Sequence, residues 1–469
     1  MNASLLPNPL PVQPFHLPPS GKAWIPGSKS ITNRALLLAT LGYGRTRLHG
    51  VLLSRDTRIM IDALRTLGFR VELNEEKREI EVWGTGGTFT VERATLAVGN
   101  AGTAARFLTA LLALAPNGEF HLDGDPAMRE RPMEGLLRAL AELGTQFQFH
   151  GKPWSFPFTL QSHGLRGGRV AVDASASSQI LSALLMVAPC ASSPLSVELI
   201  GETVSAPFVT MTRRMIAQFA PRLGKPTDEA PAEPFSYQIE PDATATSYFL
   251  MLPWVTGGSV EIPNAFQNPD REQPPLQGDT RFLSLLVEEG LIELEPLPGG
   301  GGLVRAGRCR QIRPTDFNDF SDTFLTLAAV APLFEERCVI EGIGHTRHQE
   351  TDRIAAMAAE LRRLQQPVKE EPDRLVITPD LDALRAAAAQ GRSKGALLTI
   401  DTYEDHRIAM SFAILGSYDL MGDGQPWLQI ADPECTGKTF PEFFEVLQQL
   451  HDPHAPPPDN KPAQPRNSG

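Results

Sequence analysis

Two kinds of predicted helix alternate along the chain, and they differ in the spacing of their hydrophobic residues. Helices of the first kind begin with small or polar residues and then become almost continuously apolar, which is typical of buried helices. They are predicted at residues 28–42, 100–114, 175–189, 242–258, 321–336 and 403–416. Helices of the second kind have apolar residues at i, i+3, i+4 and i+7, as at Ile354, Met357, Ala358 and Leu361, so we expect them to be half exposed. They are predicted at residues 54–69, 129–144, 205–220, 279–290, 349–364 and 436–450.

Short strand-like segments lie between these helices, for example at residues 45–51, 78–84, 168–175, 257–263, 336–343 and 373–379. The helix pairs return roughly every 70 to 80 residues, which indicates six related modules of mixed α/β structure. A chain of 469 residues is too long for one ordinary core, so we expect two domains of three modules each. The segment 225–244, between the third and fourth modules, is the predicted crossing point between the domains.

Composition excludes several classes of partner and indicates where the protein is located. The net charge of −12 argues against a nucleic-acid partner or an anionic membrane surface. No apolar run approaches the roughly 20 residues that span a membrane. The four cysteines have no spacing typical of a metal or redox site, which predicts no metal and a reducing, cytoplasmic location. Residues 1–20 do not resemble a signal peptide, and the Pro-rich residues 453–469 are predicted to be disordered.

Polar residues gather at the predicted helix starts, and most of them are basic although the whole chain is acidic. A positive cleft in an acidic protein favours a small, strongly anionic ligand, because arginine grips carboxylate or phosphate with two bonds and lysine offers a point charge. The residues at these starts are Lys29, Ser30, Arg34, Asn100, Gly102, Arg131, Ser177, Ser178, Gln179, Asp322, Glu350, Arg353, His406, Arg407 and Lys438.

Two carboxylates, Asp322 and Glu350, interrupt this basic set. Carboxylates among cations are suited to proton transfer. Each also has a simpler interpretation. Asp322 could be the N-cap of the helix that follows, and Glu350 could be a surface partner of Arg353.

The start of the helix at 100–114 poses a related question. Asn100 is a good capping residue, but Gly102 then falls in the first turn, where glycine costs about 1 kcal/mol relative to alanine. Arg106 follows one turn later. An anion at the helix N-terminus would explain bare backbone here, and an ordinary cap on a buried helix is the alternative.

Several of these stretches, taken in order, resemble the 5-enolpyruvylshikimate-3-phosphate synthase family. They are PGSKSITNRALLLA from Pro26, GNAGTAARF from Gly99, RERP from Arg129, SSQ from Ser177, ETDR from Glu350, DHR from Asp405 and GKTFP from Gly437. Each motif is weak alone, but the ordered set is specific. The related UDP-N-acetylglucosamine enolpyruvyl transferases share the architecture and are not expected to carry PGSKS and NAGTA at these places.

The resemblance implies an α/β fold of two lobes, each built from three βαβαββ units, with helix N-termini facing the cleft between the lobes. It places residues 24–241 in the first lobe, and residues 1–23 together with 242–452 in the second. It implies transfer of the enolpyruvyl group of phosphoenolpyruvate to the 5-hydroxyl of shikimate 3-phosphate by addition and elimination, without a cofactor, in a cytoplasmic monomer. It also implies a target of the inhibitor glyphosate, which competes with phosphoenolpyruvate.

The resemblance further assigns roles to residues of this chain. Asp322 would take the 5-hydroxyl proton, Glu350 would exchange a proton with the methylene carbon, and Lys29 would assist. The residues implied for shikimate 3-phosphate are Lys29, Ser30, Arg34, Ser177, Ser178, Gln179, Ser205, Asp322 and Gln349. Those implied for phosphoenolpyruvate are Lys29, Asn100, Gly102, Arg131, Gln179, Arg353, Arg407 and Lys438.

Four positions depart from the common pattern of this family. Gln349 stands where lysine is usual, His345 where asparagine is common, Phe208 where tyrosine is common and Phe107 where proline is common. These departures bear on substrate affinity and inhibitor response.

Two alternative functions stay open. The chain could be a non-catalytic relative that keeps the fold, although Lys29, Arg131, Asp322 and Glu350 are all present. It could also transfer the enolpyruvyl group to another acceptor.

Overall fold

A computed structural model describes residues 6–173, 177–200, 206–223, 233–264 and 274–451. Its contacts divide the chain after Pro26 and after Glu240, into two compact units. We name them the 27–240 unit and the 241–451 unit, and the second includes the N-terminal segment up to Pro26. The sequence prediction placed these boundaries after residues 23 and 241. Ser205 and the predicted disordered tail 453–469 lie outside the described residues.

The 27–240 unit alternates helices and strands. Its elements are α1 (Lys29–Leu41), β3 (Tyr43–His49), α2 (Arg55–Thr66), β4 (Arg70–Asn74), β5 (Glu79–Thr85), β6 (Arg93–Ala97), α3 (Gly102–Leu112), β7 (Gly118–Asp123), α4 (Pro126–Glu130), α5 (Glu134–Glu142), β8 (Gln146–Phe149), β9 (Phe158–Ser162), β10 (Gly168–Asp173), α6 (Ser178–Val187), η1 (Ala188–Cys190), β11 (Leu195–Ile200), α7 (Ala206–Phe219) and β12 (Phe235–Gln238). They form sheets of order β12-β3-β5-β4, β6-β7-β9-β8 and β10-β11.

The 241–451 unit follows the same plan. It begins with two strands from the N-terminal segment, β1 (Leu10–Pro11) and β2 (Ser20–Lys22). Its other elements are α8 (Ala243–Thr256), β13 (Ser259–Ile262), η2 (Gly278–Thr280), α9 (Arg281–Glu288), β14 (Ile292–Leu297), β15 (Gly301–Ala306), β16 (Thr315–Asp316), η3 (Ser321–Thr323), α10 (Phe324–Val330), η4 (Ala331–Leu333), β17 (Cys338–Glu341), η5 (Gly344–His348), α11 (Arg353–Arg363), β18 (Val368–Glu371), β19 (Arg374–Ile377), α12 (Leu381–Ser393), β20 (Leu398–Ile400), α13 (His406–Gly416), β21 (Leu428–Ile430), η6 (Pro433–Lys438) and α14 (Phe443–Gln449). Its sheets have the order β14-β15-β13-β2, β16-β17-β19-β18 and β1-β21-β20.

One repeat in each unit shows the βαβαββ module in full. In the 27–240 unit it runs β6, α3, β7, α5, β8, β9, with α4 as a short turn before α5. Strands β6 and β7 are parallel, and β9 pairs antiparallel with both β7 and β8. The sequence β16, α10, β17, α11, β18, β19 repeats this order and these pairings in the 241–451 unit. The parallel step is a strand–helix–strand crossover, which places its helix against one face of the sheet.

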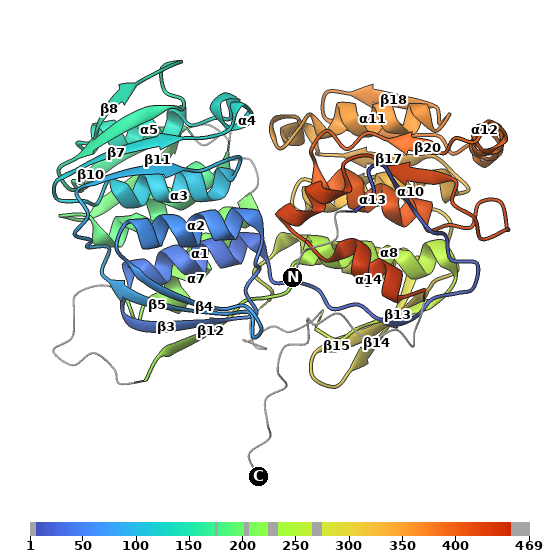
Figure 1. Ribbon diagram of the computed structural model, residues 1–469, viewed down its shortest axis with the longest axis horizontal. Coiled ribbons are helices and arrows are strands. Elements are labelled where there is room, and N and C mark those ends of the chain that lie inside the picture. The colour runs from blue at the N-terminus through green and yellow to red at the C-terminus, as the bar shows by residue number, and fades with distance from the viewer. Residues whose placement is uncertain (1–5, 174–176, 201–205, 224–232, 265–273, 452–469) are drawn as a thin grey trace, which may run out of the picture. The chain divides into compact units, whose positions relative to one another are not determined.

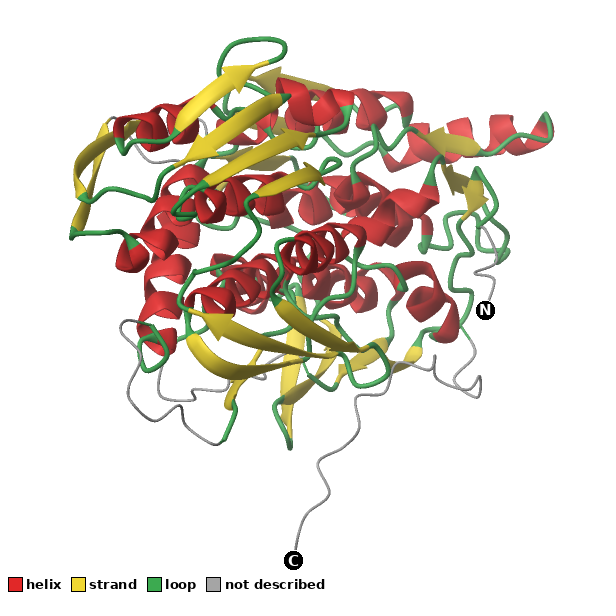
Figure 2. Cartoon of the chain, turned by 60° about the vertical axis from the view of Figure 1, so that its left-hand side comes forward, coloured by secondary structure: helices red, strands yellow, loops and turns green. Residues whose placement is uncertain are grey.

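The buried helices lie together in each unit, with the strands outside them (Figures 1 and 2). In the 27–240 unit α3 packs on α6 and α1, and in the 241–451 unit α13 packs on α10 and α8. Every residue of α3, α8, α10 and α13 is buried except the last residue of α8, Thr256. These are the nearly continuous apolar helices that the hydrophobic pattern predicts, and this burial confirms them. In the 241–451 unit, this packing brings Asp322, just before α10, within 2.8 Å of Arg407 at the start of α13.

The half-exposed helices of the second kind are also present, as α2, α5, α7, α9, α11 and α14. In α11 the residues Ile354, Met357, Ala358 and Leu361 are all buried, as their spacing predicts.

Among the described residues, helical regions also differ from the prediction. The helix predicted at residues 129–144 is interrupted, because α4 ends at Glu130 and α5 begins at Glu134, so Arg131 is the C-cap of α4 and not the start of a helix. Helix α12 is a further difference, since no helix was predicted there. The alanine-rich α12 buries only Leu384 and Ala388, so its sequence carries a weak hydrophobic pattern.

Candidate active site

Two basic groups lie near the start of α1, and one of them is buried. Lys29 is the first residue of the helix, and its Nζ lies 3.4 Å from Oδ2 of the buried Asp56 in α2. Arg34 is only 1% exposed. Its guanidinium donates to Oγ1 of Thr212 at 2.8 Å, Oγ of Ser182 at 3.2 Å and the carbonyl of Ser30 at 3.0 Å. The groups that hold Arg34 are therefore neutral.

Two aromatic rings complete the surroundings of Arg34. Its Cζ lies 5.3 Å from the ring centroid of Phe107 and 5.8 Å from that of Phe208, within cation–π range. Burial lowers the pKa of Arg34 to about 9, which still leaves it charged at neutral pH. Both rings occupy positions where the sequence departs from the common family pattern, so these departures surround one buried cation.

The start of α3 differs from the prediction in one respect. Asn100 does not cap the helix, because α3 begins at Gly102 and its N-cap is Ala101, without a side-chain cap bond. Instead, the carbonyl and Oδ1 of Asn100 accept from Nη1 of Arg131 at 3.3 and 3.4 Å. A Cβ on Gly102 would lie 2.7 Å from Cζ of Arg131. The bare backbone at Gly102 thus lets the Arg131 guanidinium approach the helix N-terminus.

Arg106 holds the next polar group in place. Its Nη1 donates to Oε1 of Gln179 at 2.7 Å, and its Nε and Nη2 donate to the carbonyl of Pro132 at 3.2 and 2.7 Å. Because Oε1 of Gln179 faces Arg106, the amide NH2 of Gln179 is directed elsewhere. Ser177 caps α6 by accepting from the Gln179 backbone N–H at 3.3 Å, and Ser178, the first residue of α6, is buried. The basic residue that the sequence placed near Gly102 therefore positions other site residues.

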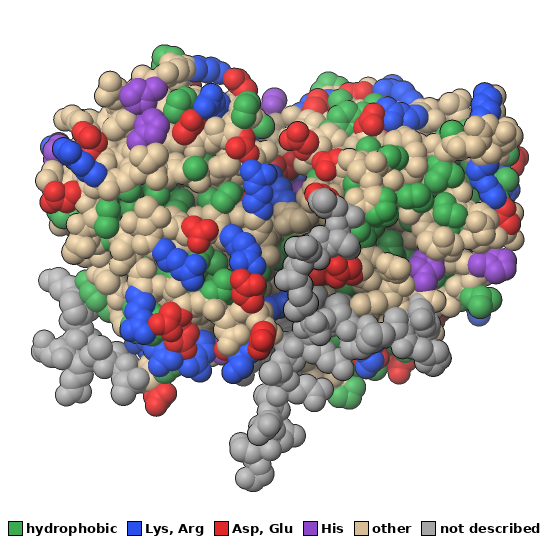
Figure 3. All heavy atoms as spheres, viewed as in Figure 1, with side chains coloured by type: hydrophobic (Ala, Val, Ile, Leu, Met, Phe, Trp, Pro, Cys, Tyr) green, Lys and Arg blue, Asp and Glu red, His purple; other side chains and the backbone are tan. Residues whose placement is uncertain are grey.

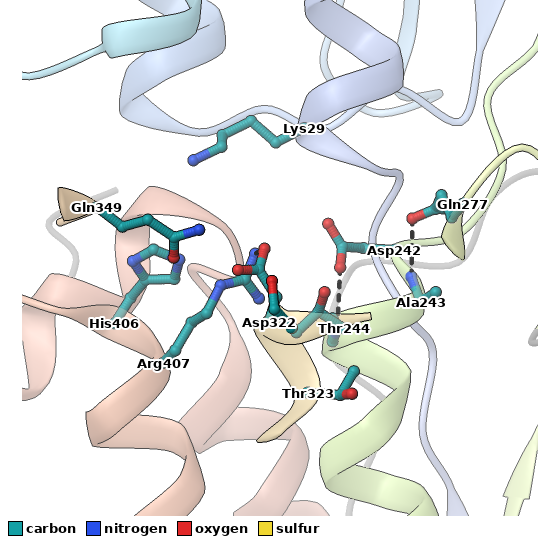
Figure 4. Close-up of polar contacts among 12 residues, drawn as sticks. Lys29, Asp242, Ala243, Thr244, Gln277, Asp322, Thr323, Gln349, His406 and Arg407 are labelled. Atoms are coloured by element: carbon teal, nitrogen blue, oxygen red, sulfur yellow. Dashed lines mark hydrogen bonds and ion pairs between the residues drawn. The ribbon is translucent and has the colours of Figure 1, made fainter. Parts of the chain in front are cut away.

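In the 241–451 unit, Asp322 contacts two arginines, of which Figure 4 labels Arg407. Its Oδ1 accepts from Nη1 of Arg353 at 2.8 Å, and its Oδ2 lies 2.8 Å from Nη2 of Arg407. Nη1 of Arg353 also bonds to Oε1 of Gln349. The predicted N-cap role of Asp322 is wrong, because Asp322 lies in η3 and the N-cap of α10 is Thr323. Two long-range ion pairs hold Asp322 instead.

A second carboxylate, Asp405, anchors the same arginines. It is fully buried, accepts from Nε of Arg353 at 2.7 Å, and caps α13 by accepting from the Arg407 backbone N–H at 2.9 Å. Burial alone would lower the pKa of Arg353, but the Asp405 and Asp322 carboxylates outweigh it and raise that pKa. Burial would likewise lower the pKa of Arg407, but Asp322, together with Tyr248, Asp242 and Asp279, outweighs that effect and raises it. Both arginines are therefore permanently charged.

Glu350 pairs with a different cation from the one expected. Its Oε2 bonds to Nζ of Lys438 in η6, and both side chains are nearly buried. The alternative interpretation, that Glu350 is a surface partner of Arg353, is wrong, because Glu350 is nearly buried and pairs with Lys438.

A histidine lies next to Asp322. Nε2 of His345 is 2.9 Å from Oγ of Ser321, the residue that precedes Asp322. Burial lowers the pKa of His345, so its ring is neutral at pH 7.

The sequence reading missed three carboxylates that the fold places in these clusters: Asp56, Asp242 and Asp279. Asp242 caps α8, and Figure 4 shows it beside Thr244 and Gln277. Burial, followed by the charge of Asp322, raises the pKa of Asp279. Asp242 carried a signal that could have been used, because it precedes a nearly continuous apolar helix. Asp56 and Asp279 carried none beyond their place near a helix start.

Charges at the surface contrast with these buried ones. Figure 3 shows basic and acidic side chains intermingled over the sheet of β3, β4 and β5, where Arg45 and Arg47 both pair with Glu81.

Among the described residues, no group of three or more His, Cys, Asp or Glu side chains is arranged to hold a metal ion. In the same part of the chain, no helix combines the length and the apolar character needed to cross a membrane.

Comparison with known proteins places the chain in a family. The family model of EPSP synthase (3-phosphoshikimate 1-carboxyvinyltransferase) matches residues 18–447. The chain belongs to the EPSP synthase family. It is 46% identical to the 3-phosphoshikimate 1-carboxyvinyltransferase of Opitutus terrae over 457 residues, which cover 95% of this chain and 98% of that protein. It is 39% identical to the enzyme of the same name from Trichormus variabilis, with coverage of 90% and 94%. As a member of the EPSP synthase family, it is an enzyme of the transferase class.

Solved structures agree on the fold. The EPSP synthase of Acinetobacter baumannii matches with a TM-score of 0.71 at 22% identity, covering 94% of this chain and 97% of that one. The enolpyruvyl transferase NikO of Streptomyces tendae matches with a TM-score of 0.65 at 15% identity, covering 95% and 98%. The α/β enolpyruvyl transferase fold expected from the motifs is thereby confirmed.

Proposed function

We propose that the protein transfers the enolpyruvyl group of phosphoenolpyruvate to the 5-hydroxyl of shikimate 3-phosphate, with release of phosphate. The observation that carries this proposal is that two carboxylates in the 241–451 unit form ion pairs with basic side chains. Asp322 is gripped by Arg353 and Arg407, and Glu350 is held by Lys438. Addition and elimination between two acidic substrates require groups that accept protons and cations that bind the anions. The ion-paired carboxylates and their basic partners offer both.

Asp322 is the proposed base for the 5-hydroxyl. Its Oδ1 accepts a hydrogen bond from Arg353 and its Oδ2 forms an ion pair with Arg407, and these two contacts fix the orientation of the carboxylate. As the hydroxyl proton leaves, the hydroxyl oxygen bonds to C2 of phosphoenolpyruvate and C3 gains a proton.

Glu350 is the proposed group that gives a proton to C3 and later removes one from the resulting methyl group. Removal of that proton re-forms the double bond as the C2–O bond to phosphate breaks, so the net products are the enolpyruvyl ether and phosphate. Lys438 holds Glu350, and Lys29 is the proposed assistant in proton transfer. General acid–base groups of this kind typically contribute about 10²–10⁴-fold to the rate.

The 27–240 unit supplies the proposed grip on shikimate 3-phosphate. Arg34 is a buried cation held by neutral groups, which suits it to a phosphate or hydroxyl-rich ligand. We assign shikimate 3-phosphate to Lys29, Ser30, Arg34, Ser177, Ser178, Gln179, Ser205, Asp322 and Gln349. Gln349 has no charge and is bonded to Arg353, so its contact with this substrate is weaker than a lysine would give.

Phosphoenolpyruvate is assigned to the arginines and lysines of both units and to the backbone at the start of α3. The proposed set is Lys29, Asn100, Gly102, Arg131, Gln179, Arg353, Arg407 and Lys438. The close approach of Arg131 to Gly102 supports this assignment, because it brings a guanidinium to the N-terminus of α3, where an anion is favoured.

Phosphate release tests the proposal directly. Purified protein is mixed with phosphoenolpyruvate and shikimate 3-phosphate, and phosphate is measured over time. Release that requires both substrates supports the proposal, and binding without turnover would instead indicate a non-catalytic relative. Turnover with another acceptor but not with shikimate 3-phosphate would indicate a different enolpyruvyl transferase. The proposal includes a cytoplasmic monomer, which light scattering with size exclusion and cell fractionation would test.

A further inference from the structure

The turn that leads into α13 has an unfavourable backbone conformation. Tyr403 and Glu404 have φ angles of 55° and 57°, in the left-handed region, and the N–H of Asp405 donates to the carbonyl of Thr402 at 2.8 Å. Two successive positive φ angles closed by such a bond are typical of a type I′ turn, which favours asparagine, aspartate and glycine. Tyrosine and glutamate are poor choices for these positions, so something outside the turn holds it.

A buried carboxylate supplies that hold. Glu360 in α11 is fully buried, and its Oε1 accepts from the Tyr403 hydroxyl at 2.7 Å. Its Oε2 accepts from the Asp401 backbone N–H at 3.1 Å and lies 3.3 Å from Nη1 of Arg363. A carboxylate removed from water needs such partners, so these contacts tie the residues just before the turn and the turn itself to α11.

The same helix carries one of the proposed phosphoenolpyruvate ligands. Arg353 lies two turns before Glu360 in α11, and it bonds to Asp405 at 2.7 Å, directly after the strained turn. Helix α11 therefore holds the 401–405 segment at two points, through Glu360 on one side of the turn and through Arg353 on the other. Asp405 in turn caps α13 and fixes the backbone N–H of Arg407.

We infer that Glu360 and Tyr403 are positioning residues that hold the 402–405 turn, so that Asp405 orients Arg353 and Arg407 toward phosphoenolpyruvate. This inference rests on the proposed function, and it concerns phosphoenolpyruvate most directly. Neither Glu360 nor Tyr403 needs to touch a substrate for this role.

The variant Tyr403→Phe tests the role, because it removes the hydroxyl and keeps the ring. We expect the KM for phosphoenolpyruvate to rise about tenfold, the effect of losing one hydrogen bond to a buried carboxylate. The KM for shikimate 3-phosphate should rise less, by no more than about twofold, because only two of its nine proposed residues, Asp322 and Gln349, contact Arg353. Equal rises in both KM values, or no rise in either, would overturn the inference.

A rescue experiment separates positioning from general stabilisation. Glu360→Gln removes the charge and one acceptor, and we expect it to raise the KM for phosphoenolpyruvate at least as much as Tyr403→Phe. Adding Tyr403→Asn and Glu404→Gly installs the residues that a type I′ turn prefers, so the turn no longer needs the carboxylate. The KM should then return toward the wild-type value. A KM that stays high in the triple variant would contradict the positioning role.

Tyr237→Phe is the matched control. The Tyr237 hydroxyl donates to Oε1 of Gln218 at 2.7 Å, a bond of the same length in the 27–240 unit, and its loss should leave both KM values unchanged. Wild-type protein and Arg353→Lys are measured in the same series. If the wild type releases phosphate and Arg353→Lys raises the KM for phosphoenolpyruvate, a normal Tyr403→Phe refutes the positioning role alone. If the wild type releases no phosphate, the proposed function fails and the positioning role falls with it.

Discussion

The two units build their buried polar clusters from the same kind of helix start but neutralise their cations differently. In the 27–240 unit, Arg34 rests on hydroxyls and a carbonyl, and Arg106 rests on an amide and carbonyls. In the 241–451 unit, Arg353 rests on Asp322 and Asp405. Lys29 with Asp56 is the ion pair that departs from this division.

We propose that this difference separates substrate binding from proton transfer. A buried guanidinium that is held by neutral groups, as that of Arg34 is, is suited to an anionic ligand. A guanidinium held by carboxylates fixes proton-accepting groups in one orientation. We therefore expect changes to the cations of the first cluster to appear mainly in the KM for shikimate 3-phosphate and changes to the carboxylates Asp322 and Glu350 of the second mainly in kcat. Changes to the arginines of the second cluster should appear in the KM for phosphoenolpyruvate.

The largest expected effect comes from removing a proton acceptor in the second cluster. Asp322→Asn and Glu350→Gln each conserve shape, and each should lower kcat about 10²–10⁴-fold, measured as phosphate release. Asp380→Asn is the control, because Asp380 caps α12 and asparagine caps a helix equally well. A near-normal kcat in either site variant would refute the role given to that residue.

The first cluster should respond through substrate affinity. Arg34→Met fills similar volume without charge, and we expect the KM for shikimate 3-phosphate to rise about 10–100-fold while kcat changes less. Arg138→Met, at an exposed helix pair with Glu134, provides the comparison and should behave as wild type. A loss of kcat without a change in KM would argue against the proposed division between the clusters.

A smaller effect is expected from crowding Arg131. Gly102→Ala adds a Cβ 2.7 Å from Cζ of Arg131, so the guanidinium has to move, and the KM for phosphoenolpyruvate should rise about threefold to tenfold. The ratio of the glyphosate inhibition constant to that KM should rise further, because the inhibitor is longer than the substrate. Gly151→Ala, whose added Cβ would meet nothing closer than 3.5 Å, should change neither value. An unchanged ratio in Gly102→Ala would argue against placing phosphoenolpyruvate beside this glycine.

The smallest expected effect is on the pH dependence of stability. The folded protein raises the pKa of Asp279 to about 8, against an ordinary value of about 3.9 in the unfolded chain. A raised pKa means that the folded state holds the proton more tightly, so this contribution to stability is full at low pH and is lost as pH rises toward 8. Asp279→Asn removes this titration. The Tm should therefore fall less between pH 5.5 and about 8.5 in Asp279→Asn than in wild type, measured by calorimetry.

Asp319→Asn is the control for this pH experiment, because Asp319 is an exposed partner of Arg281. We expect it to lose as much Tm as the wild type over the same interval. The same loss in Asp279→Asn would mean that Asp279 is already ionised at low pH in the folded protein.

Local features of the sequence predicted most of the fold. The continuous apolar runs of α3 and α13 and the spacing of Ile354, Met357, Ala358 and Leu361 each identified a helix and its degree of burial. The Asn100 cap was wrong because capping residues are common just before helices, and only the backbone decides which residue occupies the N-cap.

The sequence named candidate site residues but not their pairings. The predicted helix starts and the motifs named Asp322, Glu350, Arg353, Arg407 and Lys438. Their partners could not be read from spacing, because Arg353 meets Asp405 across 52 residues and Lys438 meets Glu350 across 88. Glu360 looked like an ordinary exposed residue of an amphipathic helix, and only its burial reveals its contact with Tyr403.

The N-terminal strands impose an order of assembly during synthesis. Strand β1 pairs with β21, so Leu10 cannot pair until Ile430 has been synthesised. Strand β2 pairs with β13. The 27–240 unit leaves the ribosome complete while the first strands of the other unit still lack these partners. At roughly 5–20 residues per second, β1 remains without its neighbour for on the order of 20–80 s. Folding on the ribosome should therefore finish with an insertion of the chain's first residues into the unit that is made last.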